Sequence, residues 1–212
     1  MNQFDCVVVG GGMVGAASAL SLAALGLKVA IIEKSAPELF SPEQAFDLRV
    51  SAISLASEQL LKQLDAWQQL QQWRMCPYKR LGVWEFAQNY TEFNAQDISQ
   101  AHLGHIVENR LIQLSLWQQI QQHDNITLFC PETLVKLVQS PTDVELTLSS
   151  QVVRAKIVIG ADGANSFVRK LVNIGTTGWD YAQKNHNKIL PGNSFFKLDH
   201  LPCYLCQEIV RH

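Results

Sequence analysis

The chain has 212 residues, of which 47% are hydrophobic and 17% charged, an ordinary composition for one large globular domain or two small ones. Its formal net charge of −2 provides no basic footprint of the kind that nucleic-acid binding requires. The five cysteines are odd in number and widely scattered, so they predict no disulfide framework. We therefore expect a reducing, cytoplasmic setting.

The segment 4–33 has the pattern of a strand, a helix and a second strand. An apolar, β-branched run covers 4–9, a run rich in Ala and Leu covers 16–25, and a second buried strand covers 29–32. This order predicts a β-α-β unit of a parallel sheet, with a ligand bound at the carboxyl ends of its strands.

Between the first strand and the helix, Gly10, Gly12 and Gly15 form a G-x-G-x-x-G motif. In a dinucleotide-binding unit the first glycine allows the tight turn and the second lets the backbone approach a pyrophosphate. The third allows close packing of helix on strand. The helix N-terminus then offers N–H groups and a positive dipole to the phosphates. Glu33, at the end of the second strand, is placed to accept hydrogen bonds from the ribose hydroxyls of an adenosine.

Residues 6–27 carry no charge and are long enough to span a bilayer, so a membrane helix or a secretory signal is the alternative interpretation. Four glycines crowd the first half of this run, where they disfavour a helix. Asp5 precedes it, where a signal peptide would carry positive charge. Both alternatives are therefore rejected.

The rest of the chain predicts further strands and helices around this unit. A proline-containing loop covers 35–46, and the region 50–64 is helical in its later part. An α/β sheet with antiparallel insertions follows from the order of elements. The expected helices are 67–73, 108–123 and the start of one at 167–172; the expected strands are 81–86, 91–95, 103–107, 126–130, 134–139, 144–148, 152–155 and 157–159.

The stretch GADGANSFVR at 160–169 is the second informative motif. A buried strand runs into Asp162 and Gly163 and then into a helix, which places Asp162 near the ligand of the first motif. The alternative is an ordinary Asp helix cap followed by a glycine turn. The two motifs together favour the ligand-binding interpretation.

These motifs together resemble the class A flavoprotein aromatic hydroxylases, over about residues 4–184. The resemblance rests on the glycine motif with Glu33, on Asp47-Leu48-Arg49, on Val107-Glu108-Asn109-Arg110 and on 160–169. Within that class the chain looks most like the ubiquinone-biosynthesis hydroxylases, and among them the benzoquinol hydroxylases. The resemblance implies a Rossmann-like FAD-binding sheet of the glutathione-reductase type, with an antiparallel meander and a partial substrate-domain β-sheet.

The resemblance also implies cofactors and site residues. FAD would bind at Gly10, Gly12, Gly15 and Glu33, with Arg49, Arg110 and Asp162 approaching it, and NAD(P)H would be the reductant of an O2-dependent hydroxylation of a prenylated phenol or quinol. Taken alone, Arg49 and Arg110 would be read as solvent-exposed residues. The sequence identifies no catalytic acid or base. Association with the inner membrane, with a ubiquinone-synthesis complex or with further copies of the chain is compatible with the resemblance and is not specified by the residues.

The resemblance predicts a domain division. Residues 1–184 would form the FAD-binding domain, with a substrate-domain hairpin inserted at about 79–96, and 185–212 would form a tail that departs from the family pattern. Because the family's chains are longer, the chain is expected to be the N-terminal part of such a hydroxylase. The alternatives are a truncated, catalytically silent FAD-binding remnant and a flavin oxidoreductase with another substrate.

Two candidate metal motifs are discounted at this stage. His102 and His105 are spaced three apart, but the neighbouring glycine and the strand pattern argue against a metal-binding pair. Cys203 and Cys206 form a C-x-x-C without the further ligands that a zinc site needs. No metal ion is therefore predicted.

Overall fold

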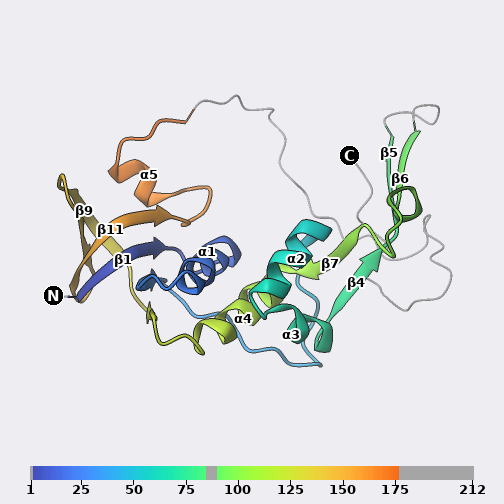
Figure 1. The fold of residues 1–212 in the computed structure, drawn as a ribbon, viewed down its shortest axis with the longest axis horizontal. Coiled ribbons are helices and arrows are strands. Elements are labelled where there is room, and N and C mark those ends of the chain that lie inside the picture. Colours follow the sequence, from blue (N-terminus) through green and yellow to red (C-terminus); the bar gives the residue numbers. More distant parts are fainter. Residues whose placement is uncertain (1, 85–89, 177–212) are drawn as a thin grey trace.

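The computed structural model describes residues 2–84 and 90–176, and its largest unit is a six-stranded sheet (Figure 1). Four neighbouring strands run parallel and two more continue the sheet in antiparallel fashion. The predicted α/β class, with a parallel sheet and an antiparallel meander, is confirmed. In spatial order the strands are β8 (Ile126–Phe129), β2 (Val29–Ile32), β1 (Asn2–Val9), β11 (Val152–Gly160), β10 (Val144–Leu148) and β9 (Leu134–Gln139).

Alternate residues of β1 face two separate hydrophobic cores. Cys6 and Val8 point to the face that is covered by α1 (Met13–Ala24) and α4 (Asn109–Ile120). Val7 and Val9 point to the opposite face, where β10, β11 and the short helix α5 (Phe167–Leu171) contribute side chains. Because β1 has a neighbouring strand on each side and is packed on both faces, it reads as a continuous apolar run.

A second, smaller sheet lies beside the helices. It has three antiparallel strands in the order β3 (Val50–Ser54), β7 (Gly104–Glu108) and β4 (Met75–Tyr78). The helices α2 (Leu55–Gln63) and α3 (Trp67–Gln72) connect β3 to β4. This sheet positions the segment that leads from β7 directly into α4.

A two-stranded hairpin lies at the end of the molecule farthest from the six-stranded sheet (Figure 1). It pairs β5 (Arg80–Trp84) with β6 (Tyr90–Asn94), which confirms the predicted hairpin, and a 3-10 turn (Ala95–Ile98) follows it. Val83 and Phe93 are 56% and 53% exposed, so an apolar face of the hairpin is uncovered among the described residues.

The structure corrects three sequence expectations. The predicted strands 152–155 and 157–159 form one strand, because β11 pairs in parallel register with β1 from Val153 to Gly160. The strand β3, before the predicted helix, was missed because its sequence VSAIS is short and mixes small and polar residues. The strand β4 was missed because it contains Pro77, which is tolerated here since β4 is an edge strand.

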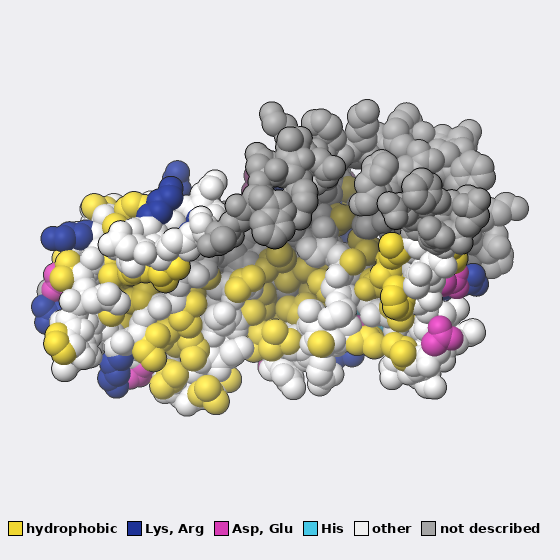
Figure 2. All heavy atoms as spheres, turned by 90° about the horizontal axis from the view of Figure 1, so that it is seen from above, with side chains coloured by type: hydrophobic (Ala, Val, Ile, Leu, Met, Phe, Trp, Pro, Cys, Tyr) yellow, Lys and Arg dark blue, Asp and Glu magenta, His cyan; other side chains and the backbone are white. Residues whose placement is uncertain are grey.

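Side-chain types are unevenly distributed over the surface that Figure 2 shows. Several Lys and Arg side chains lie toward the end formed by the six-stranded sheet, whereas hydrophobic side chains dominate the middle of this face. Within 2–84 and 90–176, no helix is both long enough and apolar enough to cross a bilayer. The segment 85–89 and the tail from 177 lie outside the described residues. The tail includes the C-x-x-C pair, Cys203 and Cys206.

Candidate functional site

The glycine motif forms the turn from β1 into α1, and each glycine meets a different environment. Gly10 has a φ of +106°, a conformation that L side chains rarely adopt, and it packs on the backbone of Ala161 and Asp162. At Gly15 a Cβ would overlap the carbonyl oxygen of Gly10, so helix and turn are in direct contact. At Gly12 a Cβ would meet nothing within 4 Å. The backbone at Gly12 is therefore open to a ligand, as the roles assigned to the three glycines require.

No side chain caps the N-terminus of α1. Gly12 is the N-cap and provides no side-chain oxygen, and the first turn contains no acidic residue. The N–H groups at this end of a helix lack intrahelical partners and lie at the positive end of the dipole. The turn therefore fits a pyrophosphate, which would be held by backbone donors.

Gly11 is the point at which three elements meet. Its N–H donates to Oε2 of Glu33 at 2.5 Å, so the end of β2 is tied to the turn. Its carbonyl oxygen accepts from Nε2 of Gln113 at 2.9 Å and from Nε1 of Trp117 at 2.7 Å, both on α4. The other oxygen of Glu33 accepts from the N–H groups of Lys34 and Ser35. Carboxylate oxygens each have two lone pairs, so Glu33 keeps capacity for ribose hydroxyls.

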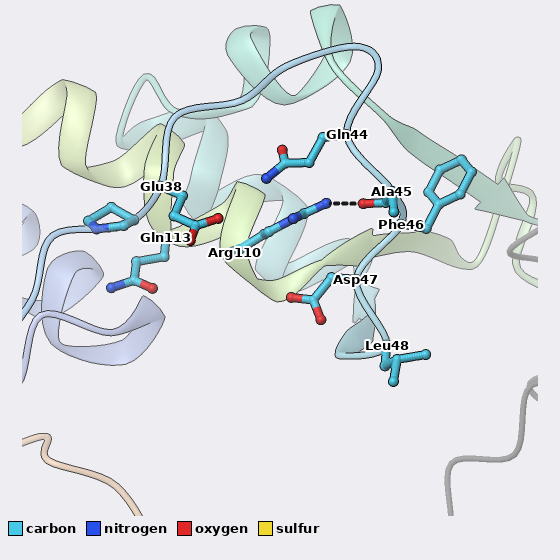
Figure 3. A pocket seen from close by; sticks show the side chains of 9 residues that line it. Glu38, Gln44, Ala45, Phe46, Asp47, Leu48, Arg110 and Gln113 are labelled. Carbon is cyan, nitrogen blue, oxygen red and sulfur yellow. Dashed lines mark hydrogen bonds between the residues drawn. The ribbon is translucent and has the colours of Figure 1, made fainter.

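A pocket of about 490 Å³ adjoins this turn, between the loop 37–48 and α4 (Figure 3). Arg110 and Gln113 line it from one face of the helix, and Glu38 and Asp47 line it from the loop. Gln113, which lines the pocket, also donates to the carbonyl oxygen of Gly11, so it links the pocket to the glycine turn.

Arg110 is fixed in place on the wall of this pocket. Its Nε and one terminal nitrogen donate to Oε2 of Glu108 at 2.9 and 2.7 Å, and that terminal nitrogen also donates to the carbonyl oxygen of Ala45 at 2.5 Å. Its side chain is 22% exposed. The guanidinium is thus oriented by the protein while part of it faces the pocket, which suits recognition of an anionic or polar ligand.

Glu108 organises the surroundings of Arg110, and sequence reasoning did not identify it as a site residue. Its side chain is fully buried, and Oε2 also accepts from the N–H of Asp47 at 2.9 Å. Its Oε1 lies 3.3 Å from Nε of Arg74, whose guanidinium packs over the rings of Phe40 and Phe46. One buried carboxylate therefore holds two arginines and the loop that lines the pocket.

Arg49 is placed beside the site through its backbone. Its carbonyl oxygen accepts from the N–H of Asn109, the first residue of α4, at 2.9 Å, and its own N–H donates to Asp47 at 3.0 Å. The residue is exposed, and its guanidinium makes no hydrogen bond or ion pair with other described residues. Arg49 and Arg110 thus lie at the same end of α4, the first exposed and the second fixed.

Asp162 lies next to the glycine turn, as predicted, because the ends of β1 and β11 are adjacent. Its carboxylate caps α5, accepting from the hydroxyl of Ser166 at 2.5 Å and from the N–H groups of Phe167 and Val168 at 2.6 and 3.0 Å. Burial raises the pKa of this carboxyl, but the hydrogen bonds outweigh burial, so its pKa is below the usual aspartate value. The capping role that was weighed as the alternative is therefore present in the structure.

The structure brings the predicted residues of the first motif, Arg110 and the backbone of Asp162 to one edge of the parallel sheet. Sequence reasoning missed Glu108, Gln113 and Trp117 as parts of this arrangement. The spacing of Gln113 and Trp117, four apart on a predicted helix, was the only signal that could have paired them.

The fold and the open glycine turn define a dinucleotide-binding domain. A family model described as FAD dependent oxidoreductase matches residues 5–135. The chain therefore belongs to the FAD dependent oxidoreductases.

Curated relatives refine this assignment. The chain is 44% identical to the 3-demethoxyubiquinol 3-hydroxylase of Escherichia coli over 84% of its own length and 46% of that protein. It is 31% identical to a mitochondrial ubiquinone biosynthesis monooxygenase of Danio rerio over 85% of its length and 40% of that protein. The chain thus spans less than half of these relatives.

Solved structures agree on the fold. A probable FAD-dependent monooxygenase from Pseudomonas aeruginosa matches with a TM-score of 0.68 and 19% identity, over 85% of this chain and 48% of that one. A p-nitrophenol 4-monooxygenase from Pseudomonas putida matches with a TM-score of 0.66 and 19% identity, over 81% and 44%. The predicted class A flavoprotein fold is confirmed.

Proposed function

We propose that this chain is the FAD-binding part of a monooxygenase that hydroxylates a prenylated phenol or benzoquinol ring in ubiquinone biosynthesis. The observation that carries the proposal is the 44% identity with 3-demethoxyubiquinol 3-hydroxylase over 84% of this chain. Bound FAD would supply the redox chemistry, taking electrons from NAD(P)H and passing them to O2. The chain's own residues bind and orient the cofactor and shape the space beside it.

Within this proposal each part of the site has a task. The pyrophosphate lies at Gly10, Gly12 and Gly15, against the N-terminus of α1, and the adenosine ribose hydroxyls donate to Glu33. A carboxylate at this position disfavours a 2′-phosphate, so the bound nucleotide carries none.

The pocket next to the turn takes the middle of the same cofactor. Arg110 and Gln113 supply hydrogen-bond donors from α4. Arg49, which is exposed beside the N-terminus of that helix, adds a positive charge near the pocket. Asp162 contributes mainly through its backbone, because its carboxylate is engaged in capping α5.

The domain division is part of the proposal. We assign 1–184 to the FAD-binding domain and the hairpin at about 79–96 to a substrate-domain sheet. The exposed apolar side chains of the hairpin support this assignment, because a two-stranded hairpin is marginal alone and gains stability from further strands.

The cofactor assignment is tested by FAD titration of the Glu33→Ala variant. Hydrogen bonds to a charged group contribute about 1.5–3 kcal/mol, so the affinity for FAD should fall roughly ten- to a hundredfold. Glu43→Ala, an exposed carboxylate in the neighbouring loop, is the matched control and should bind FAD as the unmodified chain does. Unchanged FAD affinity in Glu33→Ala would remove Glu33 from the site.

The reaction is tested with a full-length protein that contains this sequence. It should restore quinone to a strain that lacks the 3-demethoxyubiquinol hydroxylase, and a quinol analogue should stimulate its oxidation of NAD(P)H. Tight FAD binding without either activity would instead support the catalytically silent module. Oxidation of an unrelated substrate, with quinone still absent, would overturn the pathway.

A further inference from the structure

A cluster of one glutamate and two histidines lies apart from the residues that line the cofactor pocket. Glu58 is on α2, His105 is on β7, and His102 is in the segment just before β7. Nε2 of His102 lies 2.8 Å from Oε2 of Glu58, and Nδ1 of His105 lies 3.2 Å from the same oxygen. One ligand atom from each residue can be chosen so that all three lie within 4.8 Å of one another.

The two histidines are adjacent, contrary to the sequence expectation. Their ring centroids are 4.4 Å apart. The neighbouring glycine and the strand pattern argued against a metal-binding pair, but His102 precedes β7, so the alternation of that strand does not apply to it. Glu58 is 44 positions away from His102 in the sequence, which is why the third member was not foreseen.

His105 contains a nitrogen without a hydrogen-bond partner among the described residues. Its side chain is 10% exposed, and Nδ1 lies 3.2 Å from Oε2 of Glu58 without forming a hydrogen bond to it. Leaving a buried polar atom unpaired costs about 1–3 kcal/mol. This nitrogen points toward the carboxylate, in the position that a metal ligand would occupy.

The spacing of the three atoms suits a small tetrahedral ion. Bonds of about 2.0–2.2 Å to imidazole nitrogen and carboxylate oxygen place neighbouring ligands roughly 3.3–3.6 Å apart. The observed 2.8 and 3.2 Å to Oε2 of Glu58 lie near this spacing, and the three ligand atoms are all within 4.8 Å of one another. Lys62 contacts the other oxygen, Oε1, at 2.6 Å, whereas Oε2 faces the two histidines.

The donor set selects the kind of ion. Two imidazoles and one carboxylate suit Zn²⁺ and neighbouring transition metals, whereas Ca²⁺ and Mg²⁺ prefer sites made of oxygen. The side chain of His102 is 23% exposed, so water can reach a fourth position. Three protein ligands with an open position is a common zinc arrangement.

We propose that Glu58, His102 and His105 bind one Zn²⁺ ion. The ion would join α2 to β7 and would engage the nitrogen of His105 that otherwise makes no hydrogen bond with the described residues. The proposal is independent of flavin binding, because none of the three residues lines the pocket beside Arg110.

The test is a titration of the purified chain with ZnCl2 by calorimetry, and with CoCl2 by visible absorption. The tail carries Cys203, Cys206 and further histidines, so the titration uses a Cys203→Ser/Cys206→Ser background. We expect one ion per chain, a Co²⁺ spectrum typical of a four-coordinate site, and a higher melting temperature with Zn²⁺. MgCl2 at the same concentration should give none of these effects.

Two variants locate the site. His102→Ala changes a partly exposed residue and should leave the fold intact by circular dichroism, yet weaken Zn²⁺ binding by at least about 100-fold. His123→Ala, which removes a histidine outside the cluster, should bind as the background does. Zn²⁺ affinity that is unchanged in His102→Ala and in His105→Ala, or the absence of stoichiometric binding in the background, would overturn the proposal.

Discussion

The indole N–H of Trp117 donates to the carbonyl oxygen of Gly11 at 2.7 Å, linking two residues that are 106 positions apart in the sequence. The indole ring also packs against the turn, because a Cβ on Gly11 would lie 2.9 Å from it. The helix α4 therefore supports the glycine turn through Trp117, and it also lines the neighbouring pocket through Arg110 and Gln113.

Trp117→Phe should weaken both stability and FAD binding. The substitution keeps an aromatic ring but removes the donor, so the oxygen of Gly11 keeps only its hydrogen bond from Gln113. We expect a loss of about 1–2 kcal/mol in the free energy of unfolding, measured by urea denaturation, and lower FAD affinity by fluorescence titration. Trp73→Phe, a partly buried tryptophan away from the turn, is the control for FAD affinity. Equal FAD affinity in both variants would show that this hydrogen bond does not support the turn.

Alanine at Gly12 should act mainly on FAD binding, and alanine at Gly15 mainly on stability. At Gly12 the φ of −66° suits any residue and the added Cβ has free space, so stability should change by less than about 1 kcal/mol. FAD affinity should still fall at least tenfold, because the Cβ occupies the space where the pyrophosphate approaches. At Gly15 the Cβ overlaps the backbone of Gly10, so we expect a loss of at least about 2 kcal/mol. Thermal unfolding and FAD titration distinguish the Gly12→Ala and Gly15→Ala variants. Undiminished FAD binding by Gly12→Ala would mean that the phosphates bind elsewhere.

Glu108→Gln should be severely destabilising. The carboxylate is fully buried between Arg74 and Arg110, and neutralising it leaves two guanidinium groups without their shared anion. Breaking a buried pair costs about 3–5 kcal/mol, and Arg110 and the loop beside Asp47 should become more mobile. Urea denaturation gives the energy, and hydrogen exchange of 44–48 reports the loop.

The matched control is the exposed ion pair between Glu145 and Arg154. Glu145→Gln changes the same chemical group in a solvated environment, with side chains 34% and 44% exposed. Such pairs contribute about 0–1 kcal/mol. Equal losses in Glu108→Gln and Glu145→Gln would mean that the buried network does not hold the pocket.

The cap of α5 should be sensitive to acid. The pKa of Asp162 is lowered in the folded chain, so its carboxylate contributes to stability at pH above its unfolded-state pKa and loses that contribution as the pH falls through the folded-state pKa. Asp162→Asn should cost about 1 kcal/mol at pH 7, and the difference from the unmodified chain should shrink below about pH 4. Hydrogen exchange at Phe167 and Val168 measures this directly. Asp124→Asn, at an exposed turn, should show no such dependence.

The sequence was most informative where local chemistry dictates local structure. The run 4–33 combines β-branched strands, a glycine turn and an Ala-rich helix, and each feature favours the same β-α-β unit. The strand that ends at Gly160 was predicted for the same reason, and the structure confirms that its end lies beside Gly10. In both places the residues that determine the conformation are neighbours in the chain.

The sequence was least informative where the partners are distant. Glu108 meets Arg74, and Glu58 meets His102, only because the three-stranded sheet brings together β3, β7 and β4, two of which were not predicted. The position of a charged residue in the sequence pattern does not show whether its side chain will be buried or exposed. The helix-capping role of Asp162 is local, and it was foreseen as the alternative.

The pairing of β1 with β11 also determines when the site can form during synthesis. These strands join residues such as Asp5 and Lys156, which are 151 positions apart, and Gly10 packs on Ala161. Until the ribosome has added that intervening chain, the edge of β1 that pairs with β11 is unpaired. The glycine turn then also lacks its contact with Ala161 and Asp162. Cofactor capture should therefore follow emergence of the GADG segment, and until then the nascent β-α-β unit presents an apolar strand edge that chaperones can recognise.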